Sequence, residues 1–267
     1  MKVDYHVHTS LCGHARGRMR QYVEEAIVRG IAKMGFSDHT PLPPDKADPS
    51  LAMTEAQMAD YVETVLALRA EYKGQIQIAL GFEADYIPGF EEKLTELLRP
   101  FPLDYVSGSV HFLGRWAFDN PSEREQYDSW EPDRLYKRYF ATLCQAAKSG
   151  LFDFMAHPDL IKKFNYWPSG PLEPFWAQAA AAFKESKVAI ELNSAGWHKE
   201  VAEAYPNPGF LRACALAGVP VTFGSDAHAP EQVGRDWQRA VKTLREAGYG
   251  EIATFQGRCV TLEPLSV

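Results

Sequence analysis

The stretch Asp4-Tyr5-His6-Val7-His8, close to the start of the chain, decides both the fold and the site. We expect a short strand over 2–6 that ends at the first of its two histidines. In an extended chain, side chains at positions i and i+2 leave the same face, so His6 and His8 point at one centre. Because imidazole is a common ligand of divalent metals, the stretch predicts a metal site at the end of the first strand.

Short apolar runs alternate with amphipathic segments along the rest of the chain. Further strands are predicted over 33–37, 77–81, 104–110, 152–156, 188–192 and 219–223, and an extended tail begins at Ile252. Helices are predicted over 19–29, 54–72, 134–149, 177–184, 210–217 and 237–247. This alternation is typical of an α/β protein with a parallel sheet.

Residues suited to metal binding follow the predicted strands. They are His6, His8, His14, His39, Glu83, His111, His157, Asp226 and His228. In a parallel barrel, the loops after the strands converge on the axis, whereas an open doubly wound sheet gathers ligands at one switch point. We therefore predict a TIM-barrel-like fold of about seven strands, with the active site at their carboxyl ends.

Isolated histidines are usually ordinary core or surface groups, so the set carries the argument and no single member does. Of the eight histidines, seven lie at or just beyond strand ends, and only His198 does not. We expect Asp38 to orient His39 without binding metal itself. Cys12 is expected to pack and not to bind. A mixed shell of nitrogen and oxygen suits zinc, manganese or iron.

Composition excludes several classes of partner. The 267 residues are 46% hydrophobic and carry a net charge of −7, which gives no field for binding nucleic acid. There is no apolar run long enough to cross a membrane, and the four cysteines form no Cys-x-x-Cys motif. No Gly-x-Gly-x-x-Gly or Walker motif is present. We expect a cytoplasmic protein that acts on a small molecule.

The set of histidines and acids resembles that of the polymerase and histidinol phosphatase (PHP) superfamily. The resemblance to its histidinol-phosphatase branch lies in Cys12-Gly13-His14, Gly81-Phe82-Glu83-Ala84-Asp85, Gly108-Ser109-Val110-His111, His157-Pro158-Asp159, Glu191-Leu192-Asn193-Ser194-Ala195-Gly196 and Gly224-Ser225-Asp226-Ala227-His228. It implies one domain over 1–267, folded as a distorted (β/α)7 barrel with three divalent metal ions. It also implies hydrolysis of L-histidinol phosphate in histidine biosynthesis, by attack of a metal-activated hydroxide on phosphorus.

The resemblance also implies how the ligands divide. His6, His8, Glu83 and Asp226 would surround one metal. Glu83 would also reach a second metal, completed by His111 and His157. The third would be held by His14, His39 and His228. Catalytic roles would fall to Glu83, Asp226 and His228, with Asp38 beside them.

The phosphate also needs hydrogen-bond donors or cations. Candidates are Lys162, Lys163, His198, Lys199 and Arg235. The branch usually has Gly-Leu-Arg-Lys-Pro after the sixth strand, whereas this chain reads Gly196-Trp197-His198-Lys199-Glu200, so an imidazole replaces an arginine fork. For the amine and imidazole of histidinol, the candidate carboxylates are Asp85, Asp119 and Asp159.

The sequence leaves three alternatives open. The first is a phosphatase that has the same metal centre and acts on another small phosphate ester. A barrel with a non-catalytic metal site in an assembly is the second alternative, although no appended domain or basic groove is evident. A zinc-dependent amidohydrolase is the third, but it normally has a bridging lysine where this chain has Glu83.

Overall fold

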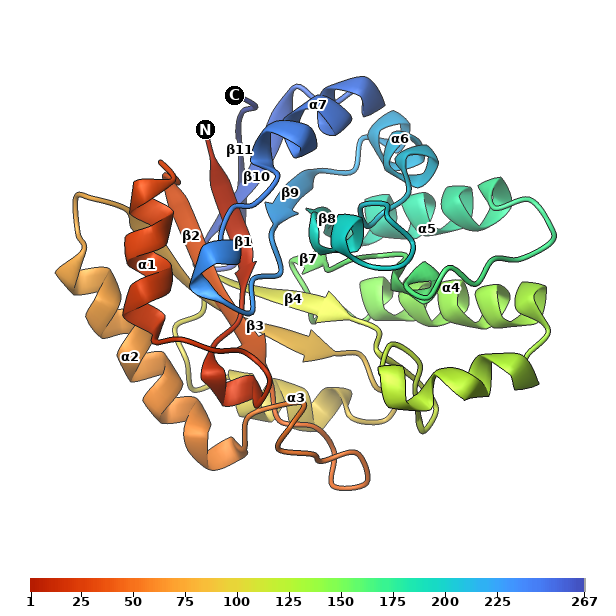
Figure 1. Cartoon of the computed structure of the whole chain (residues 1–267), viewed down its shortest axis with the longest axis horizontal. Helices are drawn as coiled ribbons and strands as arrows, with labels where there is room; N and C mark the ends of the chain where they lie inside the picture. The colour runs from red at the N-terminus through yellow and green to blue at the C-terminus, as the bar shows by residue number, and fades with distance from the viewer. Residues whose placement is uncertain (267) are drawn as a thin grey trace.

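Seven parallel strands form one sheet in a computed structural model that describes residues 1–266 (Figure 1). Their order in the sheet is β1-β2-β3-β4-β7-β8-β9. They comprise β1 (Val3–Val7), β2 (Lys33–His39), β3 (Gln77–Asp85), β4 (Tyr105–Ser109), β7 (Phe154–Met155), β8 (Ala189–Asn193) and β9 (Val221–Gly224). The two outer strands meet at their carboxyl ends, where His8 N donates to Ala227 O at 2.9 Å and Ala227 N to His6 O at 3.1 Å. The sheet is thus a nearly closed barrel, which confirms the predicted fold class.

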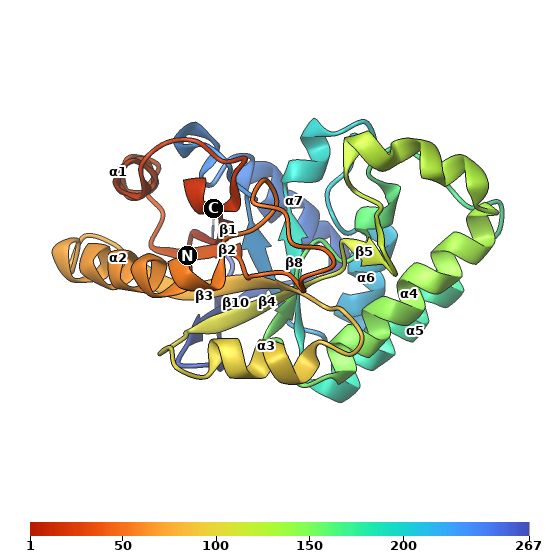
Figure 2. The same ribbon diagram turned by 90° about the horizontal axis from the view of Figure 1, so that it is seen from below.

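Helices surround the strands in both views of the ribbon (Figures 1 and 2). They are α1 (Met19–Val28), α2 (Met58–Glu71), α3 (Glu91–Leu98), α4 (Pro132–Lys148), α5 (Glu173–Ser186), α6 (Pro208–Ala217) and α7 (Trp237–Ala247). Short 3-10 helices are η1 (Ser10–Cys12), η2 (Glu55–Gln57), η3 (Pro121–Ser129), η4 (Leu160–Lys162), η5 (Ala195–His198) and η6 (Pro230–Gln232). Six of the seven α-helices lie where the sequence predicts them. The exception, α3, has eight residues and buries only Leu94, Leu97 and Leu98, too few for a clear helical period.

Two hairpins add to the barrel. One, β5 (Phe112–Leu113) with β6 (Trp116–Ala117), follows β4 and leads into η3. The other is β10 (Glu251–Gln256) with β11 (Cys259–Pro264), formed by the tail that the sequence predicts to be extended. Thr222 of β9 donates to Ala253 O at 3.0 Å, which ties this second hairpin to the barrel.

The amino end of the barrel is filled by aromatic rings. Tyr105 lies against Gly35 and Gly81, where a Cβ would come within 2.3 Å of its hydroxyl oxygen and of its ring, respectively. Its hydroxyl lies 2.9 Å from Tyr5 O, and Phe255 of the tail hairpin packs on both tyrosines. The strands therefore need glycine at these positions, and the hairpin closes this end with apolar surface.

An irregularity in β1 affects the direction of its side chains. The pairing of β1 with β2 shifts between Asp4 and Val7, so one extra residue lies on β1. Such a bulge re-aims side chains next to a site. Tyr5 can thereby face the aromatic end while its neighbour His6 faces the carboxyl end.

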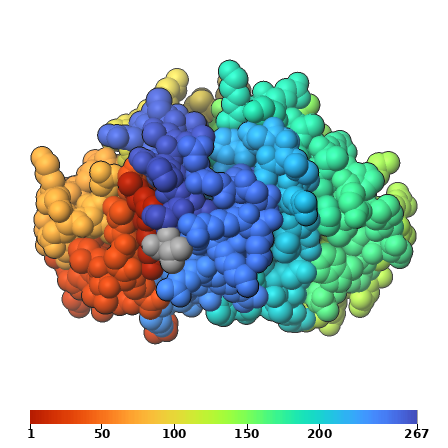
Figure 3. Space-filling view, turned by 90° about the horizontal axis from the view of Figure 1, so that it is seen from above, coloured from red at the N-terminus to blue at the C-terminus, as the bar shows by residue number. Residues whose placement is uncertain are grey.

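The two ends of the described chain lie close together. The amino group of Met1 donates to Pro264 O at 3.0 Å, and Figure 3 shows the last segment packed beside the first strand. Among residues 1–266, none of the helices is both long and apolar enough to cross a membrane.

Candidate active site

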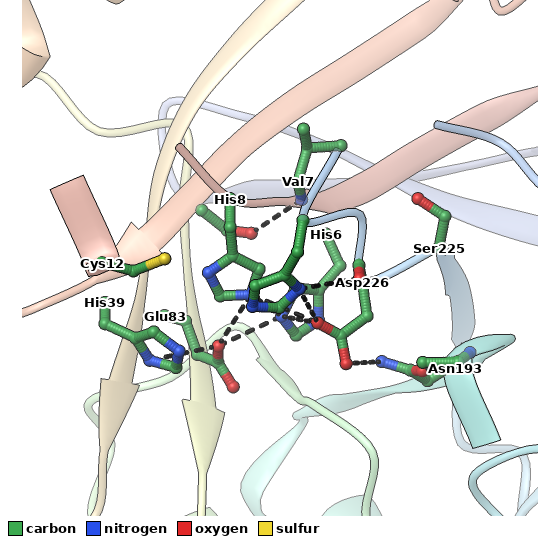
Figure 4. A network of polar contacts seen from close by, with 12 residues as sticks. His6, Val7, His8, Cys12, His39, Glu83, Asn193, Ser225 and Asp226 are labelled. Atoms are coloured by element: carbon green, nitrogen blue, oxygen red, sulfur yellow. Dashed lines mark hydrogen bonds and ion pairs between the residues drawn. The ribbon is translucent and has the colours of Figure 1, made fainter. Parts of the chain in front are cut away.

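Four side chains from three strand ends converge on one point (Figure 4). His6 Nε2 lies 3.0 Å from His8 Nε2, 3.1 Å from Glu83 Oε2 and 3.8 Å from Asp226 Oδ1. His8 Nε2 lies 3.4 Å from the same oxygen of Glu83 and 3.3 Å from that of Asp226. Three of the four are almost fully buried, and the side chain of Asp226 is 18% exposed.

These separations fit a shared cation. Ligand atoms at the corners of a tetrahedron with bonds of about 2.0–2.1 Å lie about 3.3 Å apart. Five of the six separations among the four atoms are those given above, and all fall between 3.0 and 3.8 Å. Two imidazole nitrogens that face each other and two carboxylates do not satisfy one another well without a cation between them. The residues present therefore fit a divalent metal.

Glu83 lies between two groups of imidazoles. Its Oε2 faces His6 and His8 and lies 3.4 Å from His39 Nδ1. Its Oε1 lies 2.9 Å from His157 Nε2 and 3.8 Å from His111 Nε2. This is the arrangement of a carboxylate able to bridge two cations, with one oxygen for each.

A third group of rings lies toward the opening. His228 stacks on His8 with ring centroids 4.1 Å apart and on His14 at 4.7 Å, and His14 lies 5.8 Å from His39. His8, His39 and His228 bring one ring nitrogen each within 4.8 Å of one another, and so do His14, His228 and the sulfur of Cys12. All nine predicted ligands thus meet at the carboxyl end, with His14 the most exposed.

Four of these imidazoles have an oxygen partner on Nδ1, which leaves Nε2 for the centre. The partners are Glu191 Oε1 for His6 at 2.8 Å, Asp85 Oδ1 for His111 at 3.0 Å, Cys12 O and Ser50 O for His14 at 2.9 Å, and Asp226 O for His228 at 3.0 Å. Metal-bound histidines typically donate their other N–H in this way, which fixes the tautomer and raises basicity.

Glu191 was not among the predicted site residues. It is fully buried, and besides His6 it accepts from His157 N at 2.9 Å and from Asn193 Nδ2 at 3.0 Å. Gly224 makes room for it, because a Cβ there would lie 1.7 Å from Glu191 Oε1. A charged residue inside the apolar run 188–192, two positions before Asn193, was the available signal.

The acids at the start of β1 and the end of β2 hold the backbone around the site. Asp4 accepts from Ser225 N at 2.9 Å and Gly234 N at 2.7 Å, which joins β1 to the loop after β9. Asp38 Oδ2 accepts from Thr9 N at 3.2 Å, and its Oδ1 lies 3.5 Å from His8 Nδ1. It touches His39 only at the backbone N, at 3.0 Å, so the prediction that Asp38 orients the ring of His39 is wrong.

The charges of the centre depend on one another. Burial alone would raise the pKa of Glu83 and Asp226, but the imidazoles around them hold the pKa of both carboxyls well below the usual range. Burial and the neighbouring His8 lower the pKa of His228 to about 3. Burial also raises the pKa of the Cys12 thiol to about 12.

Two of the converging residues have unusual backbone conformations. His157 has φ 29° and Asp226 has φ 53°, both in the left-handed region that L-residues seldom adopt. Such strain persists only where the surroundings enforce it, and it clusters at functional sites.

The ligand groups face a cavity, here called the metal pocket, which is lined also by Lys163, His198, Lys199, Tyr205 and Arg235. A second cavity, the side pocket, adjoins it and is lined by Leu42, Leu51, Phe112, Asp119 and Asn120 among others. His14, His39, His111, Asp119 and Lys163 line both. Four of the five side chains predicted to contact phosphate thus line the metal pocket.

Two other candidates lie elsewhere. Lys162 is buried and paired with Asp159 Oδ2 at 2.9 Å and Glu203 Oε2 at 3.1 Å, so it is not a phosphate contact. Asp159 also accepts from Asn207 N at 2.7 Å, so it is not a substrate carboxylate. Asp85 is occupied by His111, which leaves Asp119 as the predicted carboxylate that faces both cavities without holding an imidazole ring.

The comparisons with known proteins agree with this geometry. The model of the PHP domain family matches residues 4–195. A protein of Deinococcus radiodurans, named as a probable histidinol-phosphatase, is 42% identical over 255 residues, which cover 96% of each chain. The histidinol-phosphatase of Bacillus subtilis is 30% identical over 256 residues, covering 87% of this chain and 96% of its own.

A solved structure has the same fold. The histidinol phosphate phosphatase of Lactococcus lactis, in complex with zinc, L-histidinol and phosphate, has a TM-score of 0.83 at 22% identity over 97% of this chain and 98% of its own. This chain therefore belongs to the PHP family, in its histidinol-phosphatase branch.

Proposed function

We propose that this protein is a metal-dependent phosphomonoesterase that hydrolyses L-histidinol phosphate to L-histidinol and phosphate, as a single domain. The observation that carries the proposal is the convergence of His6, His8, Glu83 and Asp226 at the separations of metal ligands. Membership of the histidinol-phosphatase branch supports the substrate. The reaction belongs to histidine biosynthesis.

We assign three divalent ions to the nine ligand residues. His6, His8, Glu83 and Asp226 would hold the first, Glu83 with His111 and His157 would hold the second, and the rings nearest the opening, His14, His39 and His228, would hold the third. Such ions lower the pKa of bound water toward neutrality and neutralise phosphoryl charge. Zinc, manganese and iron all suit this mixed shell.

The chain's own residues orient the ester. Arg235 is held by Ser225 O, which its Nη2 reaches at 3.1 Å, and it lines the metal pocket with Lys199. Lys163 Nζ donates to Asp119 O at 2.6 Å and lies 3.0 Å from Asp119 Oδ2. These three cations surround the place where a phosphate would meet the metals. His198 lies farther out, half exposed and paired with Asp236 Oδ2 at 2.7 Å.

The alcohol part of the substrate fits the side pocket. Burial favours the neutral acid of Asp119, but the Lys163 ammonium and His111 hold its pKa at about 2, so it is ionised at neutral pH. An anionic carboxylate at the boundary of the two cavities suits the amine of histidinol. Leu42, Leu51 and Phe112 supply apolar surface for its imidazole.

The alternative is a phosphatase for a different small ester, which shares the centre and differs in the side pocket. Steady-state rates on histidinol phosphate and a panel of other phosphomonoesters separate the two. We expect kcat/KM to be highest for histidinol phosphate by at least tenfold. A higher value for another ester would contradict the substrate assignment and leave the metal centre unaffected.

A further inference from the structure

One buried hydroxyl at the site has no role in the scheme above. Tyr205 is 1% exposed and lines the metal pocket together with His157, Lys163 and Lys199. Its Oη has no hydrogen-bond partner among residues 1–266. A buried phenol normally finds a partner, because leaving its O–H unpaired is unfavourable. The same oxygen is also closed to a water-sized probe, so a molecule in the pocket reaches it only after a small rotation of the ring.

The backbone of this tyrosine is held firmly. Asn193 and Tyr205 form an isolated antiparallel bridge, in which Asn193 N donates to Tyr205 O at 2.6 Å and Tyr205 N to Asn193 O at 3.1 Å. The bridge starts at the end of β8, the strand that carries Glu191. Tyr205 is thus attached to the same strand end that supports His6.

Lys162 and Asp159, which do not line the metal pocket, hold the segment 203–207 from the other side. Lys162 Nζ donates to Ala204 O at 2.8 Å and to Glu203 Oε2 at 3.1 Å, and it lies 5.5 Å from the centre of the Tyr205 ring. Asp159 accepts from Asn207 N at 2.7 Å. The segment 203–207 is therefore held on both sides, and a donor on a fixed backbone stabilises charge with little reorganisation during the reaction.

The surroundings determine what this donor meets. Burial first, and then the nearby carboxylates Asp159, Asp226 and Asp119, raise the pKa of Tyr205 well above its usual value, so the group stays a neutral O–H. Tyr205 lines the metal pocket and not the side pocket. A hydroxyl on this side of the cavity would meet the phosphoryl group and not the alcohol that leaves.

We infer that the Tyr205 hydroxyl donates a hydrogen bond to a non-bridging phosphoryl oxygen of the bound ester and of the product phosphate. The inference rests on the proposed phosphatase function and adds a neutral donor to the cationic contacts. The inference also gives a role to Lys162 and Asp159, which follow the predicted ligand His157 in the sequence but do not line the metal pocket. Their contacts to Ala204 O and Asn207 N hold the backbone on either side of Tyr205.

The test compares Tyr205→Phe with Tyr249→Phe, both in the metal-loaded enzyme. Tyr249 Oη is also buried and without a partner among residues 1–266, but it lies just after α7, outside the metal pocket. A hydrogen bond to a charged group changes affinity by about ten- to a hundredfold. We expect Tyr205→Phe to weaken binding of inorganic phosphate by that factor in titration calorimetry, and Tyr249→Phe to leave it within twofold.

Kinetics distinguish a phosphoryl contact from one to the leaving group. Tyr205→Phe should lower kcat/KM by the same factor for histidinol phosphate and for p-nitrophenyl phosphate, with metal content and melting temperature unchanged. Unaltered phosphate binding, a loss confined to histidinol phosphate, or loss of metal would each overturn the inference. If the phenylalanine variant does not fold, 3-fluorotyrosine at position 205 replaces it, and its more acidic hydroxyl should tighten phosphate binding.

Calorimetry measures phosphate binding without turnover. Its result for Tyr205 therefore does not depend on whether the enzyme hydrolyses histidinol phosphate. If wild-type enzyme binds phosphate but does not hydrolyse histidinol phosphate, the proposed substrate is refuted, and the role of Tyr205 in phosphate binding is still tested by the calorimetry. Wild-type enzyme that hydrolyses histidinol phosphate, with no effect of Tyr205→Phe on phosphate binding, would refute Tyr205 alone.

Discussion

The two ends of the barrel are built from the same strands but hold opposite kinds of side chain. At the amino end, Tyr5, Tyr105, Phe154 and Phe255 pack ring against ring, with centroids 5.2 to 5.9 Å apart. At the carboxyl end, buried imidazoles and carboxylates face one another. The first end is filled mainly by apolar rings, and its buried carboxylate Asp104 is satisfied by protein donors, whereas the second needs a cation to satisfy its polar atoms.

Stability and function therefore depend on different residues of the same strands. In β3, Gly81 accommodates the ring of Tyr105, and Glu83, two residues on, reaches the imidazoles. A change at one end should alter the free energy of unfolding, and a change at the other should alter metal binding and turnover.

The largest effect is expected for Glu83→Gln. The substitution removes the charge that faces both groups of imidazoles, so at least one metal should be lost and kcat/KM should fall by about a thousandfold or more. Elemental analysis and phosphate release measure the two losses. The control is Asp104→Asn, a buried carboxylate at the amino end that accepts from Leu80 N at 2.8 Å. It should destabilise the fold and keep the metals; equal metal loss in both variants would contradict the separation.

Phe255→Ala should be the largest change at the amino end. Removing a buried ring that packs on two tyrosines and Phe154 leaves a cavity and lowers the free energy of unfolding by about 3–5 kcal/mol. Below its melting temperature the variant should retain full metal content and kcat. The control is Val260→Ala on β11, where the side chain is 49% exposed. A large drop in kcat for Phe255→Ala would show that the ends are coupled.

Glu191→Gln tests the residue that the sequence reading missed. The amide keeps the shape but weakens the hydrogen bond to His6 Nδ1 and presents an N–H to His157 N or Asn193, so metal affinity should fall by about ten- to a hundredfold. Competition with a chelator measures it. Glu263→Gln, beside Lys33 at the amino end, should leave affinity unchanged. Unaltered affinity in both variants would remove Glu191 from the site.

The smallest effect is expected at His198, where the loop departs from the usual arginine. Because His198 is half exposed and paired with Asp236, His198→Ala should raise KM for histidinol phosphate only about threefold, and His198→Arg should lower it. Metal content should not change in either variant. If both stay within about twofold, roughly 0.4 kcal/mol, His198 does not contact the substrate.

The barrel and the ligand residues were accessible from sequence because both follow local rules. Short apolar runs located the strands that precede Glu83 and the other ligands, the i, i+2 spacing put His6 and His8 on one face, and parallel topology brought the strand ends together. Glu191 was missed because only residues beyond the strand ends were considered as site residues, and Glu191 lies inside its strand. The positions of Tyr205, Asp159 and Lys162 could not be predicted from the sequence. They depend on the backbone bridge between Tyr205 and Asn193 and on the buried ion pair of Lys162 with Asp159. The helix α3 was too short to show its period.

The most direct test of the central claim is removal and return of the metals. Purified enzyme should contain about three divalent ions per chain, because nine ligand residues exceed what one or two ions with ordinary coordination need. Stripping them with a chelator should abolish phosphate release from histidinol phosphate, and zinc, manganese or iron should restore it in proportion to the ions regained. Full turnover by enzyme shown by elemental analysis to be free of metal would contradict the account.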